Sequence, residues 1–179
     1  MQYKFYAGIG SRDTPIEVCN LMTEMAEELA DHGFTLRSGH AEGADIAFEK
    51  GSKGKNQIWL PWKGFNNAGK DGFSQTTHYI MQPNELAVSI AEKFHPNWAA
   101  CTDAARKLHT RNVYQVLGPG LGYQADTVSL FVICWTKDGK ASGGTGQAIR
   151  IAEHCNIPVF NLQHADGLDK LVAFLQEMK

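Results

Sequence analysis

The chain has 179 residues, and 17 Lys and Arg residues against 19 Asp and Glu residues give a formal net charge of −2 at pH 7. This balance excludes a protein that binds nucleic acid through bulk positive charge, although a local basic cluster is compatible with it. With 43% hydrophobic and 20% charged residues, the composition is that of a folded globular protein. The longest apolar stretch, residues 128–135, is far shorter than the roughly 20 residues that span a bilayer.

Predicted strands and helices alternate along the chain. Short apolar runs predict strands, and apolar residues three or four apart predict helices. In chain order the prediction is a strand over residues 3–8, a helix over 16–29, a strand over 34–37, a short helix over 46–50, a strand over 57–60, a long loop over about 63–82, helices over 85–94 and 102–117, a strand over 128–135, a helix over 143–155, a strand over 158–162 and a helix over 168–178.

This alternation is typical of a parallel sheet wrapped by helices. We therefore expect an α/β protein with a Rossmann-like three-layer fold, a mostly parallel sheet and a single domain over residues 1–179. The most hydrophobic strand, residues 128–135, is expected at the centre of the sheet. Thr14, followed by Pro15 and, three residues after Thr14, by Glu17, predicts a capped start of the first helix.

Three segments repeat one pattern, in which a strand leads through a glycine-rich turn into a helix. They are residues 8–14, 38–45 and 142–147. Each turn brings backbone N–H groups and a helix N-terminus to the carboxyl edge of the sheet, where open parallel sheets bind ligands. The glycines either let the backbone approach a phosphate or serve only to make tight turns. None of the three has P-loop spacing, and the strict GxGxxG fingerprint is absent.

Several side chains near these turns have more than one interpretation. Arg12 can hold a phosphate bidentately or lie on the surface, and Ser11 and Ser38 can donate to an anion or cap helices. Asp45 can stabilise the helix dipole, bind a ribose hydroxyl or act as a base. Trp135 can stack on a base or cover the end of the sheet.

The sequence also resembles a known family. YAGIGSRDTP, SGHAEGAD, the pair Arg111 and Asn112, and SGGTGQAIRIAEHCNIPVFNL resemble the SLOG superfamily, and within it the DNA-processing protein A (Smf) branch. The resemblance covers residues 3–162. It implies a Rossmann-type core that binds a nucleotide ligand or single-stranded DNA, or that cleaves nucleotides as the LOG-type N-glycosidases do, and it implies that Arg111 and Asn112 face the pocket.

The chain departs from both enzymatic and DNA-binding members of this superfamily. The LOG-type enzymes carry PGGxGTxxE, in which the glutamate is catalytic. In this sequence Ser142 replaces the proline, and Gln-Ala-Ile-Arg at residues 147–150 stands where the threonine and the glutamate would fall. The DNA-processing branch usually has an arginine at the position of Glu42, where a carboxylate would repel a phosphate backbone.

Metal and disulfide chemistry show no signature in the sequence. The seven histidines lack HxxxH and HxH spacing, and the four cysteines lack CxxC spacing, so we expect no metal site. Widely separated cysteines and an N-terminus without an apolar signal core predict reduced thiols and a cytoplasmic protein.

We therefore expect a protein that binds a nucleotide or nucleotide-derived small molecule, without a cofactor, and forms a homo-oligomer. An N-glycosidase, whose only loop carboxylates are Glu42 and Asp45, and a single-stranded DNA-binding protein remain alternatives, the latter less favoured; no membrane association is expected. The expected ligand-binding residues are Gly8, Gly10, Ser11, Arg12, Ser38, Gly39, Gly43, Asp45, Arg111, Asn112, Trp135, Thr136, Gly143, Gly144, Thr145 and Gln147.

Overall fold

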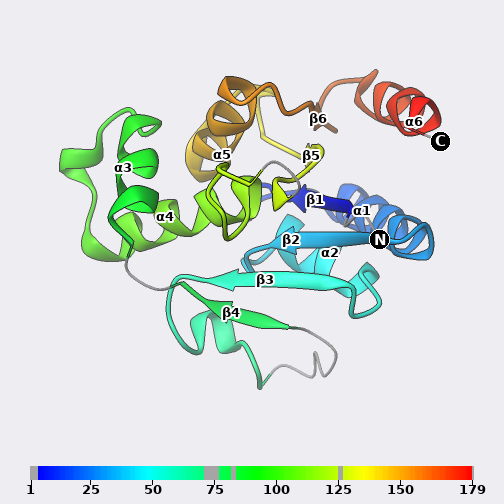
Figure 1. The fold of residues 1–179 in the computed structure, drawn as a ribbon. Coiled ribbons are helices and arrows are strands. Elements are labelled where there is room, and N and C mark those ends of the chain that lie inside the picture. Colours follow the sequence, from blue (N-terminus) through cyan, green and yellow to red (C-terminus); the bar gives the residue numbers. More distant parts are fainter. Residues whose placement is uncertain (1–3, 71–76, 82–83, 125–126, 179) are drawn as a thin grey trace.

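A six-stranded sheet forms the centre of the protein in a computed structural model that describes residues 4–70, 77–81, 84–124 and 127–178 (Figure 1). All neighbouring strands run parallel, in the order β4-β3-β2-β1-β5-β6. The strands are β1 (Lys4–Gly8), β2 (Phe34–Ser38), β3 (Asn56–Leu60), β4 (His78–Ile80), β5 (Val132–Cys134) and β6 (Val159–Asn161). The expected α/β fold with a parallel sheet is confirmed.

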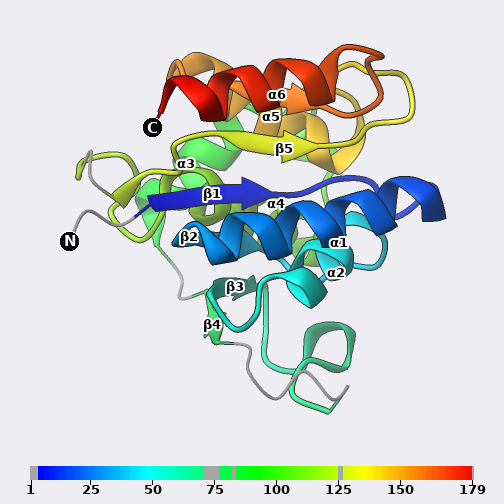
Figure 2. The same ribbon diagram turned by 90° about the vertical axis from the view of Figure 1, so that its right-hand side faces the viewer.

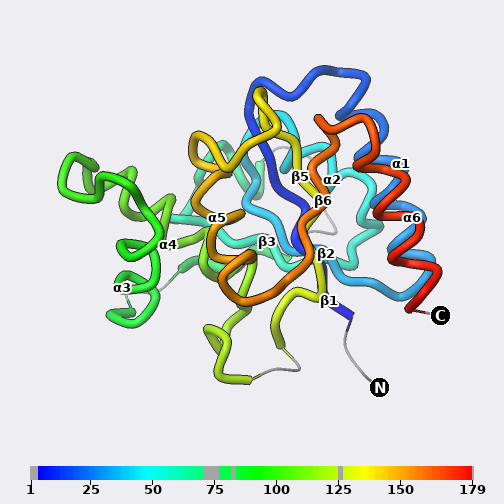
Figure 3. Tube along the Cα trace, turned by 90° about the horizontal axis from the view of Figure 1, so that it is seen from above, coloured from blue at the N-terminus to red at the C-terminus, as the bar shows by residue number. Residues whose placement is uncertain are grey.

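Helices cover both faces of the sheet (Figures 2 and 3). One face carries α1, α2 and α6, which lie nearest the viewer in Figure 2, and the other face carries α3, α4 and α5. The helices are α1 (Ile16–Asp31), α2 (Ala44–Gly51), α3 (Glu85–Lys93), α4 (Asp103–Leu117), α5 (Gly143–His154) and α6 (Gly167–Glu177). None of the helices within the described ranges is long and apolar enough to cross a membrane.

Each face of the sheet has its own hydrophobic core. Successive residues of a strand point to opposite faces, so Tyr6 packs in the cluster of α1, α2 and α6 while Ala7 packs in the cluster of α3, α4 and α5. Tyr6 stacks on Phe131 with ring centroids 5.6 Å apart. The two cores make the expected three layers, helix, sheet and helix.

The direction of the chain across the sheet reverses beside β1. From β1 the chain adds β2, β3 and β4 on one side, and then returns to add β5 and β6 on the other. The turns that follow β1 and β5 therefore leave the same edge in opposite directions. In open α/β sheets this point, where strand order reverses, is where ligands bind.

The structure differs from the sequence prediction at three places. The segment expected as a loop over 63–82 contains a 3₁₀ turn, η1 (Phe65–Asn67), and β4, while residues 71–76 and 82 lie outside the described ranges. The strand expected over residues 128–135 spans only Val132–Cys134, as β5. It is interior but lies next to the edge strand β6, and β1 lies nearer the centre of the sheet. Thr14 does not cap α1: Pro15 is the N-cap residue, and the Thr14 hydroxyl donates to the Ser11 carbonyl.

Candidate functional site

A cavity of about 490 Å³ lies at the carboxyl ends of β1 and β5. All three glycine-rich turns approach it, and α4 closes the remaining side. Among the expected ligand-binding residues, those that line the cavity are Gly10, Ser11, Arg12, Asp45, Arg111, Asn112, Thr136, Gly143, Gly144 and Thr145.

The turn after β1 is held against β5 by its backbone. The Ser11 N–H donates to the Trp135 carbonyl at 3.1 Å, and the Ser11 hydroxyl accepts from the Asp13 N–H at 3.1 Å. These bonds fix the backbone on both sides of Arg12, whose exposed side chain lies on the rim of the cavity. The turn therefore presents a guanidinium to the cavity while its backbone stays anchored to the sheet.

The turn after β2 packs directly on the first turn. Gly43 has a φ of +80°, and a Cβ there would lie 2.6 Å from the Ser11 carbonyl oxygen, so only glycine fits. The N–H of the next residue, Ala44, donates to the same carbonyl at 3.4 Å. This contact places the start of α2, and with it Asp45, at the wall of the cavity.

Asp45 and Arg111 form a buried pair facing the cavity. The Asp45 carboxylate accepts from the Ala41 N–H at 3.3 Å and lies 3.7 Å from Arg111 Nη1, which donates to the Gly39 carbonyl at 2.6 Å. Burial raises the pKa of Asp45 to about 6, and the Arg111 charge only partly offsets it.

Two effects disfavour the charged form of the Arg111 guanidinium. Burial lowers its pKa, and Arg12 lowers it further, while Asp45 acts in the opposite direction. Two guanidinium groups thus repel each other across the same cavity. An anion between them would relieve that repulsion and provide a partner for both charges.

The N-terminus of α5 opens toward the cavity without a side-chain cap. The hydroxyl of the N-cap residue Ser142 donates to Asp138 at 2.7 Å instead of accepting from the helix. Within the described part of the chain, a Cβ at Gly143 or Gly144 would meet no heavy atom within 4 Å. The first-turn N–H groups and the positive end of the helix dipole therefore border open space, as an anion site requires.

Asn112 connects α4 to this helix start. Its side-chain amide donates to the Gly144 carbonyl at 3.2 Å and to Gln147 Oε1 at 3.1 Å. Gln147 is fully buried, and its own amide donates to the Ala91 carbonyl at 2.9 Å. Gln147 therefore does not line the cavity but lies behind its wall, where it holds α3, α4 and α5 together.

The remaining expected residues support the cavity without lining it. Ser38 donates to the Gly8 carbonyl at 2.6 Å, and a Cβ at Gly8 would collide with Phe48, so both positions serve the packing of β1, β2 and α2. The Trp135 side chain lies in the core, where it cannot stack on a ligand base. Glu42 is exposed and does not line the cavity.

One face of α4 adds residues to the cavity that are not among those predicted from the sequence. Ala105, Leu108 and His109 line the cavity together with Asn112. Their spacing of three to four residues puts them on one side of a helix. The pair Arg111 and Asn112 pointed to this helix, and the helical spacing could have extended the prediction toward its N-terminus.

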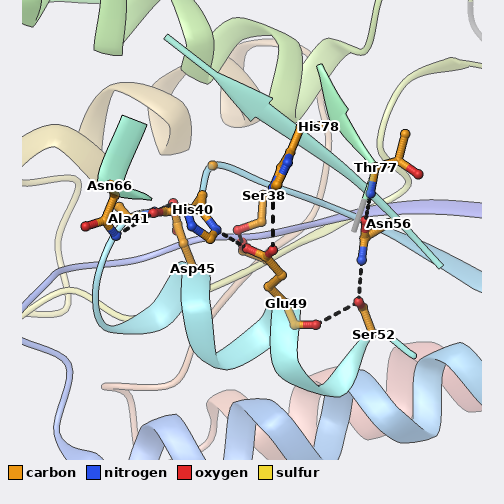
Figure 4. Close-up of polar contacts among 12 residues, drawn as sticks. Ser38, His40, Ala41, Asp45, Glu49, Ser52, Asn56, Asn66, Thr77 and His78 are labelled. Carbon is orange, nitrogen blue, oxygen red and sulfur yellow. Dashed lines mark hydrogen bonds and ion pairs between the residues drawn. The ribbon is translucent and has the colours of Figure 1, made fainter. Parts of the chain in front are cut away.

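A buried polar network lies behind the second turn (Figure 4). The fully buried Glu49 carboxylate lies 2.6 Å from His40 Nδ1 through one oxygen and 4.0 Å from His78 Nε2 through the other. Asn66 donates to the His40 carbonyl at 2.9 Å. The network ties α2 to β4 and η1, and it holds the segment that carries Asp45.

Two groups of side chains in the described ranges have the chemistry of metal ligands. They are His40 with Glu49 and His78, and His95 with Cys101 and His109; in each group the ligand atoms lie within 4.8 Å of one another. Each group combines residues of separate elements, so the sequence shows no metal-binding spacing for either.

Comparisons with known proteins bear on the fold. No protein-family model and no curated protein matches the chain. Among solved structures, DNA processing protein A from Helicobacter pylori, described by its single-stranded DNA binding mode, superposes with a TM-score of 0.60 at 20% identity, over 98% of this chain and 74% of that one.

Two further structures are similar. The Moco carrier protein of Chlamydomonas rheinhardtii superposes with a TM-score of 0.53 at 15% identity, over 98% of this chain and 85% of that one. DNA processing protein A from Streptococcus pneumoniae gives 0.52 at 14% identity, over 96% of this chain and 56% of that one. The chain shares a Rossmann-like α/β fold with these proteins.

Proposed function

We propose that the cavity binds a nucleotide or nucleotide-derived small molecule and that the ligand's phosphate lies at the N-terminus of α5. The observation that carries this proposal is the helix start without a side-chain cap, where a Cβ on Gly144 would meet no heavy atom of the described residues within 4 Å. Glycine there allows a phosphate to reach the backbone N–H groups directly.

The charges around the cavity support an anionic ligand. Arg12, Arg111 and Lys137 line it, against the carboxyl groups of Asp13 and Asp45. Burial raises the pKa of Asp45 to about 6, so its carboxyl group loses its negative charge as the pH falls below that value and the cavity then becomes more positive. The volume of about 490 Å³ falls in the range of small-molecule sites, roughly 300–1,000 Å³.

The apolar wall and the acid suggest how the rest of a nucleotide would bind. Ile9, Leu108 and Ala148 offer apolar surface for a base. Asp45 can exchange hydrogen bonds with a ribose hydroxyl, since its carboxyl accepts when ionised and also donates when protonated. This arrangement gives each chemical part of a nucleotide a matching surface.

The ligand can be identified directly. Protein purified from its expression host is denatured, and the released small molecules are analysed by mass spectrometry. Calorimetry then compares that compound with nucleoside monophosphates, nucleoside diphosphates and a single-stranded oligonucleotide. A phosphorylated nucleoside compound that binds with one site per chain supports the proposal, whereas binding of unphosphorylated compounds alone would contradict it.

A nucleotide N-glycosidase is the second candidate, and Asp45 is the observation that favours it. A carboxyl group in a cavity with a pKa raised to about 6 can hold and donate a proton near neutral pH. Incubation with nucleoside monophosphates, followed by chromatography for free base, tests this candidate. Base release that Asp45→Asn abolishes and Glu42→Gln leaves unchanged would establish it in place of simple binding.

A further inference from the structure

Two histidines and a cysteine meet beside the cavity, on the side formed by α4. His95 follows α3, Cys101 follows the 3₁₀ turn η2 (Trp98–Ala100), and His109 lies on α4. The Cys101 Sγ lies 3.6 Å from His95 Nε2, and the two imidazole rings are 4.3 Å apart between centroids. We propose that His95, Cys101 and His109 bind a zinc ion.

The spacing of the donor atoms suits zinc. Bonds of about 2.0–2.1 Å to nitrogen and 2.3 Å to sulfur in a tetrahedron separate the two ligand atoms by about 3.6 Å. The His95–Cys101 distance already has this value, and all three ligand atoms lie within 4.8 Å of one another. No pair therefore needs to close by more than about 1.5 Å, which side-chain rotation at half-buried positions can supply.

A second layer of contacts orients His109 for this role. Its Nδ1 lies 3.2 Å from Gln147 Oε1, which can only accept, so Nδ1 carries the proton and Nε2 keeps its lone pair. The orientation of the Gln147 amide is itself fixed, because its nitrogen donates to the Ala91 carbonyl and its oxygen accepts from Asn112. A histidine that donates one N–H to a protein oxygen is the usual arrangement at metal sites.

Zinc binding would rearrange the contacts of the other two ligands. His95 Nδ1 accepts from the Asn97 N–H at 3.1 Å. Binding of zinc through Nε2 would place the ring proton on Nδ1, so this hydrogen bond would be lost. The Cys101 thiol, 3.6 Å from the Asn97 carbonyl, would bind as a thiolate and release one proton to solvent. Binding of one Zn²⁺ therefore releases one proton, and three protein ligands hold the ion.

Three protein ligands leave the fourth position of a tetrahedral ion open. Thiolate and imidazole ligands together favour zinc over magnesium or calcium, which prefer oxygen. His109 lines the ligand cavity, so the ion would lie beside it. The open position would take water or an oxygen of a molecule in the cavity.

The test uses the full chain, freed of metal with a chelator and kept reduced with a phosphine. We expect Co²⁺ to bind at one ion per chain and to give the near-ultraviolet absorption of a thiolate–cobalt bond. Cys101→Ser should abolish this absorption, and Cys155→Ser, at an exposed cysteine elsewhere, should retain it. The cluster of His40, Glu49 and His78 contains no cysteine, so an ion bound there gives no such band.

Calorimetry with Zn²⁺ supplies the second measurement. Loss of an outer-shell partner typically costs a metal site roughly tenfold in affinity, so His109→Ala, which removes a ligand, should weaken Zn²⁺ binding by at least that factor. His164→Ala, at an exposed histidine, should leave the Zn²⁺ affinity unchanged. Thermal melting monitors folding, and Cys101→Ala and His109→Gln replace any variant that does not fold. Absence of the thiolate band, its survival in Cys101→Ser, or unchanged Zn²⁺ affinity of the folded His109 variant would overturn the proposal.

Discussion

The two arginines that face the cavity differ in what their removal would disturb. Arg111 is buried, pairs with Asp45 and donates to Gly39, so truncating it would leave a buried carboxyl group and a carbonyl without their partner. Arg12 is exposed on an anchored backbone. A substitution at Arg12 therefore separates ligand binding from folding.

Arg12→Ala should weaken binding of the phosphorylated ligand by roughly 1.5–3 kcal/mol, the usual contribution of a hydrogen bond to a charged group. Arg12→Lys should recover part of this loss, because lysine restores the charge but not the bidentate geometry. Calorimetry on both variants, with melting temperatures as the folding control, checks the result. Equal affinities of wild type and Arg12→Ala would remove Arg12 from the ligand contacts.

Asp45 should give the protein a characteristic dependence of stability on pH. Its pKa is raised from 3.8 to about 6 in the folded protein. The folded state therefore holds this proton more tightly than the unfolded state does, and protonation of Asp45 stabilises the fold. The resulting stabilisation is complete below about pH 4 and is lost as the pH rises through about 6; two pKa units correspond to about 3 kcal/mol. Asp45→Asn has no titrating group and should lack this decline.

Denaturant unfolding of wild type and Asp45→Asn between pH 4 and pH 7.5 measures the difference. The free energy of unfolding of the variant should gain on that of the wild type as the pH rises. Asp13→Asn, at an exposed carboxyl on the same cavity, is the matched control and should run parallel to the wild type. Parallel curves for Asp45→Asn would show that its carboxyl group does not titrate in this range.

Among the elements, the start of α5 is central to the proposed function. Gly144 lies in the first turn, where a Cβ meets no neighbour, and its backbone is outside the left-handed region. Gly144→Val should therefore leave the fold intact, since valine is no worse in a helix than glycine. Its side chain would fill the space of the phosphate and lower affinity by at least about tenfold, or 1.4 kcal/mol.

The control for this substitution is Ala173→Val, at an exposed position of α6 away from the cavity. It tests whether a branched side chain on a helix disturbs binding indirectly. Calorimetry and thermal melting on both variants separate the two effects. If Gly144→Val binds with wild-type affinity, the glycine serves only the turn.

Some elements of the fold have a local signal in the sequence, and others do not. The apolar pattern predicts the strand over residues 3–8 and the helix over residues 16–29, and the structure has β1 and α1 there. The strand β4 has no such signal, because its three residues gain their structure from pairing with β3, where Ile58 pairs with His78. Strand pairing of this kind depends on chain segments far apart in sequence.

The candidate site divides in the same way. The three glycine-rich turns lie together because carboxyl ends of parallel strands share one edge, which the alternating pattern implies. The metal-ligand cluster and the cavity face of α4 depend on how α3 and α4 pack, for which the sequence has no local signal. Trp135 follows a strand like the site residues, yet the alternation of side chains turns it into the core.

At the scale of the whole molecule, the cavity lies where the strand order reverses, between β1 and β5. The turns that follow β1 and β5 diverge there and leave a space between them. The structurally similar DNA processing protein A is described as binding single-stranded DNA. Binding of a long single strand requires positive charge that extends beyond a single cavity.

The net charge of −2 predicts that any binding of single-stranded DNA depends weakly on salt. The cavity offers three cationic side chains, Arg12, Arg111 and Lys137. Each phosphate neutralised on a single strand contributes roughly −0.7 to the slope of log affinity against log salt concentration. If each of the three side chains neutralises one phosphate, the slope should be no steeper than about −2. Titration of an oligonucleotide at several salt concentrations measures this slope, and Arg12→Ala should reduce it by about one contact. A slope steeper than about −4 would require a basic track outside the cavity and would favour a DNA-binding protein over a nucleotide-binding one.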